Sequence, residues 1–95
     1  MIKDAEIAMV HAATYALEYQ DKKPGADVEE IIKQFTRDFN YEIKPETKVY
    51  SIAAINAILK IKRLKENKEK SNRQLIQVFM KSIPELQRGI SEEED

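Results

Sequence analysis

Apolar residues are concentrated in the middle of the chain, where residues 47–64 read TKVYSIAAINAILKIKRL. On a helical wheel at 3.6 residues per turn, the large apolar side chains of this segment point in most directions. One narrow stripe is polar, and it consists of Asn56, Lys60, Arg63 and Asn67. A helix that is apolar over most of its circumference is buried on several sides, so the pattern predicts a central helix surrounded by other helices. The segment is too short, and too closely flanked by lysines, to span a membrane.

This central helix is predicted to be long. Pro45 suits a first helical turn, and the sequence contains no clear stop signal over residues 45–70. A helix of that span would measure about 39 Å at 1.5 Å per residue and would extend beyond its neighbours. The extending part contains Leu64 as its sole apolar residue. We therefore expect local charge pairs such as Lys62–Glu66 to stabilise it.

Two shorter helices are predicted before the central one. The first runs from about Asp4 to Gln20, and its apolar face is mostly alanine, so another helix can approach its backbone closely. The members of that face are Ile2, Ala5, Met9, Ala12, Ala13, Ala16 and Leu17. Tyr15 and Tyr19 lie at the edge of the face, where their hydroxyl groups can reach solvent or a partner.

The second helix has the cleanest helical periodicity in the chain. Residues 21–25 contain a Pro-Gly pair and form the clearest loop. Asp27 is then a predicted N-cap, and Glu30 completes a capping box. The helix runs to about Phe39 with a one-sided apolar face, which consists of Val28, Ile31, Ile32, Phe35 and Phe39. Residues 40–44 are predicted to be an extended connector.

A fourth helix is predicted after Ser71, which forms a second capping box with Gln74. Its apolar residues are Leu75, Ile76, Val78, Phe79, Met80 and Ile83. A proline breaks the helical pattern after these residues, so we expect a separate short turn over residues 84–88. Gly89 is predicted to end that turn.

These elements predict an all-α fold in one domain that covers residues 1–90. It is a small bundle of four helices plus a short C-terminal turn, arranged around the long central helix at residues 45–70. Residues 91–95, with the sequence SEEED, have nothing to bury, and we expect them to form a disordered acidic tail.

Composition narrows the class of protein. A chain of 95 residues can bury a core without covalent links, and the absence of cysteine excludes disulfides, thiolate metal sites and a cysteine nucleophile. Lys3, Asp4 and Glu6 interrupt the segment where a signal peptide needs an apolar core, so the cytoplasm is the expected location. The richness in Ile, Lys and Glu is typical of heat-adapted proteins and also of some mesophiles.

Candidate catalytic chemistry is sparse. His11 is the sole histidine, with Glu18 the one carboxylate near its face of the helix, so we interpret it as a solvated surface residue. The adjacent carboxylates Glu29 and Glu30 do not face each other on a helix, which favours a capping role over acid–base catalysis. No glycine-rich phosphate loop is present. We therefore predict no enzymatic activity, no cofactor and no metal.

The formal net charge of −1 conceals an uneven distribution. Residues 1–46 hold six Lys and Arg against ten Asp and Glu, residues 47–74 hold eight against two, and residues 75–95 hold two against five. The basic middle segment is either an electrostatic footprint for nucleic acid or a solvated helix end balanced by the acidic segments. The candidate nucleic-acid contacts are Lys48, Lys60, Lys62, Arg63, Lys65, Lys68 and Arg73.

The second predicted helix and the start of the central one resemble a helix-turn-helix at the level of pattern. Two observations depart from that motif. The connector over residues 40–44 is longer than the usual three or four residues. The recognition helix would be apolar on most faces, which leaves Thr47, Lys48 and Ser51 to reach bases.

Two classes of function remain. The first is a non-enzymatic protein–protein interaction or self-associating module, with a homodimer as the expected state and a second copy or another protein as partner. Three short helices must cover most of the central helix, and any uncovered remainder would be an apolar patch of the kind that marks interfaces. The second is a small DNA-binding regulator that uses the basic segment at residues 60–73. The connector length favours interaction, and the charge segregation favours DNA. No membrane partner is expected.

Overall fold

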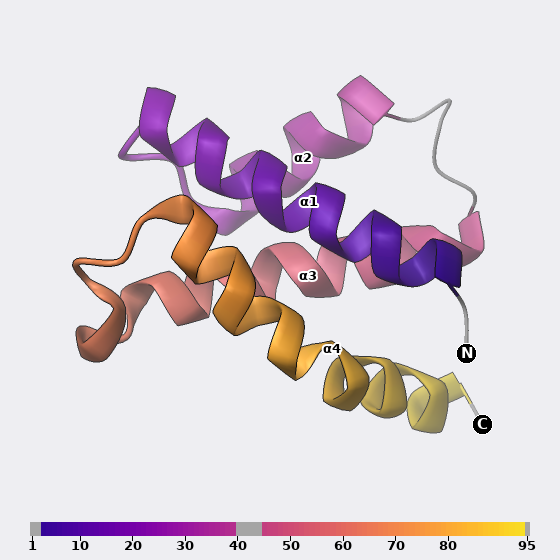
Figure 1. Ribbon diagram of the computed structural model, residues 1–95. Coiled ribbons are helices and arrows are strands. Elements are labelled where there is room, and N and C mark those ends of the chain that lie inside the picture. Colours follow the sequence, from indigo (N-terminus) through magenta and orange to yellow (C-terminus); the bar gives the residue numbers. More distant parts are fainter. Residues whose placement is uncertain (1–2, 40–44, 95) are drawn as a thin grey trace.

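The computed structural model describes residues 3–39 and 45–94 of the chain, and the regular elements of these residues are all helical. Figure 1 shows the four α-helices, which are α1 (Lys3–Lys22), α2 (Val28–Phe39), α3 (Pro45–Arg63) and α4 (Asn72–Glu94). A 3-10 helix, η1 (Lys65–Asn67), lies between α3 and α4. The predicted all-α bundle of four helices is confirmed. The predicted connector at residues 40–44 lies outside the described residues.

α1 and α3 form the central pair of the bundle, since they pack against each other more extensively than any other two elements. α2 and α4 each contact both members of this pair and lie on different sides of it (Figure 1). The alanine-rich face of α1 allows the close packing that the sequence predicts, because Ala12, Ala13 and Ala16 have no exposed surface. α3 is central as predicted, with Ile55 and Ile58 fully buried.

The start of α2 follows the sequence signal in part. The backbone N–H of Glu30 donates a hydrogen bond to Asp27 Oδ1 at 2.9 Å, so Asp27 caps the helix as predicted. The carboxylate of Glu30 accepts a hydrogen bond from the Tyr19 hydroxyl at 2.8 Å, which links α2 to α1. Ile31 and Phe35 are buried on the inner face of α2.

The prediction of one helix over residues 45–70 is wrong, because α3 ends at Arg63. Leu64 adopts an extended conformation with ψ of 136°, and η1 follows it. The buried side chain of Asn67 donates from Nδ2 to the Ile61 carbonyl at 2.8 Å and accepts from Lys70 Nζ at 2.7 Å. A helix that continued beyond Asn67 would have had no apolar face to bury. The turn instead satisfies a carbonyl at the end of α3.

The charge pair predicted between Lys62 and Glu66 is not formed in the described part of the chain. Lys62 Nζ donates instead to Gln20 Oε1 at 3.0 Å, which ties the end of α3 to the end of α1. The Gln20 side chain also donates from Nε2 to the Ala26 carbonyl at 3.2 Å. A tertiary bond therefore replaces the local pair expected for Lys62, whereas Lys70 keeps a local contact and donates to the Glu66 carbonyl at 3.4 Å.

The capping box at the start of α4 is confirmed in both directions. The Gln74 N–H donates to Ser71 Oγ at 3.2 Å, and the Ser71 N–H donates to Gln74 Oε1 at 2.9 Å. These two bonds satisfy backbone groups that would otherwise lack partners at a helix start.

The separate turn predicted over residues 84–88 is wrong, because α4 continues through Pro84 and Gly89 to Glu94. The helix therefore also contains most of the segment predicted to be an acidic tail. A buried stripe of Leu75, Phe79 and Ile83 packs on the core, and Leu86 extends it beyond the proline. The Ser82 hydroxyl donates to the Phe79 carbonyl at 2.7 Å, one turn before Pro84. Packing on both sides of the proline offsets the cost of its missing N–H.

Candidate functional site

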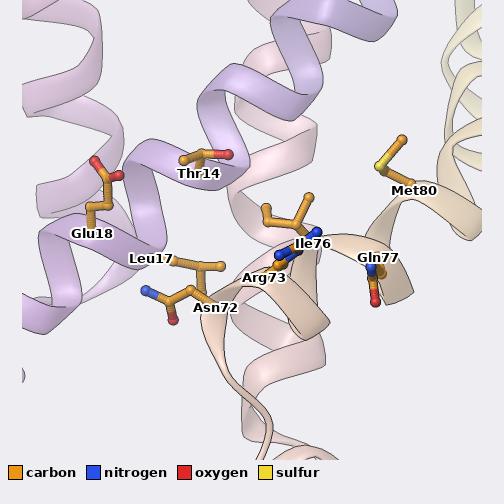
Figure 2. A pocket seen from close by; sticks show the side chains of 8 residues that line it. All are labelled: Thr14, Leu17, Glu18, Asn72, Arg73, Ile76, Gln77 and Met80. Atoms are coloured by element: carbon orange, nitrogen blue, oxygen red, sulfur yellow. The ribbon is translucent and has the colours of Figure 1, made fainter.

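A groove runs between α1 and α4 on the surface of the bundle. It consists of two adjoining hollows of about 390 Å³ and 470 Å³ that share Met80. Figure 2 shows the first hollow, where Leu17 and Ile76 lie between the two helices, Glu18 lies on the α1 side and Met80 on the α4 side. The second hollow continues along the same helices, and its apolar residues are Ile7, Val10, Met80 and Ile83.

The groove is open because α4 is apolar on more than one face. Leu75, Phe79 and Ile83 point into the core at helical spacing and are buried. At 100° per residue, Ile76 and Met80 lie on a neighbouring stripe of the helix. Ile76 is half-buried against the core, whereas Met80 is 52% exposed. α4 therefore carries apolar surface that its own bundle does not bury.

The α1 wall of the groove is similarly incomplete. Ile7 is 62% exposed and lines the second hollow together with the half-buried Val10. Isolated exposed apolar residues are normal in monomeric proteins, but Ile7 and Met80 line the same hollow from two different helices. Apolar surface from two helices is thus exposed at one place.

The two walls of the groove carry opposite charges. Glu6 and Glu18 line it from α1, and we call them the acidic wall. Arg73 lines it from α4, and the exposed Lys81 and Arg88 follow along that helix; we call these three residues the basic edge. Lys81 and Arg88 lie about a quarter turn from Met80, on the side away from Ile76 and Ile83, at 100° per residue. The basic edge thus borders the outer side of the groove.

An aromatic cluster links α1 to α2 and consists of His11, Tyr15, Tyr19, Phe35 and Phe39, of which His11 also lines the second hollow of the groove. His11 is exposed, as predicted, and its ring also meets Phe39 edge-on, with 4.6 Å between ring centroids. The Tyr15 hydroxyl donates to Asp38 Oδ2 at 2.9 Å. Burial and this acceptor raise the pKa of Tyr15. Both tyrosine hydroxyls therefore donate to residues of α2. The sequence alone had allowed them to reach solvent or a partner instead.

The basic segment is only partly gathered. Lys60, Arg63, Lys65 and Lys68 are exposed around the end of α3, and Arg73 lies in the groove. Lys62 is half-buried and bonded to Gln20, so it is held in place by α1. Lys48 lies about 18 Å from Lys60 along α3, given 1.5 Å per residue. Seven candidate contacts thus divide into a cluster of four, two residues with contacts elsewhere and one that is remote.

The helix-turn-helix pattern left three residues of the recognition helix to reach bases, and only one of these three is exposed. Thr47 and Ser51 are buried, with exposures of 8% and 0%, while Lys48 is exposed. The Ser51 hydroxyl donates to the Thr47 carbonyl at 3.3 Å, within α3. Asn56, predicted to be partly exposed, is exposed and donates from Nδ2 to the Ile52 carbonyl.

Neither metal-binding nor membrane-spanning features occur in the part of the chain that the structure describes. No three His, Asp or Glu side chains among residues 3–39 and 45–94 gather into a group that could hold a metal ion. None of the described helices is both long and apolar enough to cross a lipid bilayer.

No protein-family model and no curated protein matches this sequence, and no solved structure matches the fold. The sequence of the fourth helix does contain one indication of the groove, which is an excess of apolar residues. Five of the six residues from Leu75 to Met80 are apolar, which is more than one buried stripe can accommodate.

Proposed function

We propose that this protein is a non-enzymatic interaction module that self-associates through the α1–α4 groove. The observation that carries the proposal is the groove itself, in which Ile7 and Met80 are each more than half exposed on facing helices. Burying such side chains on association is favourable by roughly 1.5–3 kcal/mol each when burial is complete. A homodimer is the expected state, because closed two-fold pairs are the commonest form of self-association.

Light scattering after gel filtration tests the proposal over a range from about 1 to 100 µM. We expect the wild-type protein to approach twice the chain mass of 11.0 kDa as its concentration rises. Met80→Glu places a charge in the apolar groove and should weaken association by at least about tenfold. Val49→Glu is the matched control, because Val49 is an exposed apolar residue of α3, with 48% exposure against 52% for Met80.

The outcomes separate the groove from other surfaces. A dimer that survives Val49→Glu and is lost with Met80→Glu supports the proposal. The reverse pattern would place the interface on α3, and a monomer at every concentration would reject self-association. Circular dichroism of both variants checks that neither change unfolds the bundle.

DNA binding is the second candidate function, and the observation that favours it is the exposed cluster of Lys60, Arg63, Lys65 and Lys68. Binding through this cluster would release several counterions, so affinity for duplex DNA should fall steeply with salt. Lys60→Glu with Lys65→Glu should abolish such binding, whereas Lys48→Glu should leave it intact because Lys48 is remote. Salt-sensitive, submicromolar binding by the wild-type protein would move this function into first place.

A further inference from the structure

We propose that two copies of the chain stack face to face on the surfaces that carry the α1–α4 groove, with a two-fold axis that runs along the groove. α1 of each copy then lies over α4 of the other. This inference rests on the self-association proposed above and specifies its geometry. It follows from the exposed residues of the groove and from their order along it.

α1 and α4 form an outer layer of the bundle. They contact each other, and Figure 1 shows them in front of the fainter, more distant α3. The first hollow lies between Glu18 of α1 and Arg73 of α4, and the second lies between Ile7 of α1 and Met80 of α4. Residue numbers therefore fall along α1 as they rise along α4, so the two helices run antiparallel along the groove.

Each of these helices exposes one charged and one large apolar residue on the same side. At 100° per residue, Ile7 and Glu18 point within about 20° of each other on α1, and Arg73 and Met80 do so on α4. All four side chains are exposed. Ile7 and Met80, at 62% and 52%, are the two most exposed large apolar residues of the described chain. The outer layer therefore presents apolar and charged groups that its own bundle does not cover.

A two-fold axis along the groove keeps each residue at its level and exchanges the two walls of the groove. Glu18 of one copy then meets Arg73 of the other, and Ile7 of one copy meets Met80 of the other. Both contacts occur twice, because the operation is a two-fold. The most exposed apolar residues are thus buried together with opposite charges beside them, as in the apolar core and polar rim of stable interfaces.

A two-fold axis across the groove would give the opposite result. It would exchange the two ends of the groove and lay α1 of one copy over α1 of the other. Glu18 in the first hollow would then come to lie near Glu6 from the second hollow of the other copy. Like charges would face each other twice, so charge complementarity favours the axis along the groove.

The stacked pair leaves room for every helix. Packed helices lie about 8–10 Å apart between their axes, and one such distance separates α1 of one copy from α4 of the other. The two α1 helices lie diagonally across the axis and do not meet, and no helix enters the groove. Ile83 stays buried in its own bundle, with 3% exposure. Met80 lines both hollows, so the Met80 residues of the two copies border the axis.

Charge reversal tests this geometry. One variant carries Glu18→Arg and the other carries Arg73→Glu. Each alone should dimerise about fivefold or more weakly than wild type at low salt, because both charged contacts become repulsive. Mixed in equal amounts, the variants should form the heterodimer in preference to either homodimer, because both contacts are then attractive again. Native mass spectrometry distinguishes the three species by mass.

The design separates contacts between copies from contacts within one chain. Positions 18 and 73 carry like charges within each variant chain, and this remains so in the heterodimer, so recovery on mixing reports the contact between copies. Glu29→Arg and Arg37→Glu, at exposed positions of α2, are the matched controls with the same changes of net charge. A mixture of the two controls should contain its three dimers in statistical proportions. Circular dichroism checks that all four variants stay folded.

The outcomes separate this geometry from the proposed function itself. Wild-type protein that is monomeric at about 100 µM, or a dimer that Met80→Glu leaves intact, rejects both. A dimer that Met80→Glu disrupts, but that both charge variants form unchanged, rejects the geometry alone and leaves the groove as the interface. Tighter association of Glu18→Arg, as expected for the axis across the groove, also rejects the geometry alone, and so do weak variants that do not recover on mixing. A heterodimer preference that fades at high salt, and that the control pair lacks, supports the geometry.

Discussion

The two helices that flank the α1–α3 pair differ in how much of their apolar surface the bundle buries. α2 packs its apolar face on the core with no large apolar residue in the exposed class, and Phe35 is 2% exposed. Hydrogen bonds from Tyr15 and Tyr19 to its residues add polar contacts at its edge. α4 buries one stripe and leaves Met80 52% exposed. We call these the closed side and the open side. An amphipathic helix with one apolar stripe completes a fold, whereas one with a second stripe leaves surface for a partner.

The largest expected difference between the two sides is in the energy of core packing. Phe35→Ala on the closed side should lower the free energy of unfolding by about 3–5 kcal/mol, because it leaves a cavity under the aromatic cluster. Met80→Ala on the open side should lower it by less than about 1 kcal/mol, because Met80 is half exposed in the single chain. Urea unfolding at low protein concentration measures both. Equal losses would mean that the open side is part of the core.

The attachment of α4 to the bundle should show the next largest effect. Asn67→Ala removes the partner of the Ile61 carbonyl and of Lys70 Nζ in a buried position, so it should cost about 1–3 kcal/mol. Asn56→Ala is the matched control, since Asn56 is exposed and bonds only to the Ile52 carbonyl of its own helix in the described structure. It should change stability by less than about 0.5 kcal/mol. The same urea experiment applies, and equal effects would contradict a capping role for Asn67.

The polar edge of the closed side predicts a smaller, pH-dependent effect. Burial and the hydrogen bond to Asp38 raise the pKa of Tyr15 above its ordinary value of 10.0. The folded state therefore holds the Tyr15 proton more tightly, so its contribution is fully present below about pH 10 and is lost as the pH rises further. Tyr15→Phe should reduce stability by about 1 kcal/mol at neutral pH and should make the loss above pH 10 shallower. Unfolding curves at several pH values decide this, and parallel pH profiles would contradict it.

The sequence predicted the closed side more fully than the open side. The spacing of Ile31 and Phe35 and the cap at Asp27 are local signals, and the structure places all three residues as expected. Asn67 is different, because it caps a carbonyl six residues earlier only once the chain has turned back. A helical pattern with 3.6 residues per turn cannot predict this contact, because the contact forms across a turn.

Pro84 shows the opposite error. A proline is a strong local signal for a break, yet tertiary packing of Phe79 and Ile83 before it and Leu86 after it keeps α4 continuous. The groove was missed for a related reason. Ile7 and Met80 lie far apart in the sequence, and their meeting depends on where α1 and α4 pack.

The claim that a second copy docks on the open side is tested most directly by cross-linking. The chain contains no cysteine, so Met80→Cys introduces a single thiol in the middle of the α1–α4 groove. A disulfide needs Cα atoms within about 7 Å, which two such residues can reach only where the grooves of two copies face each other. Val49→Cys, at 48% exposure on α3, is the control for random collision. We predict that oxidation converts Met80→Cys to a covalent dimer far faster than Val49→Cys, and equal rates or faster linkage at Val49→Cys would contradict the claim.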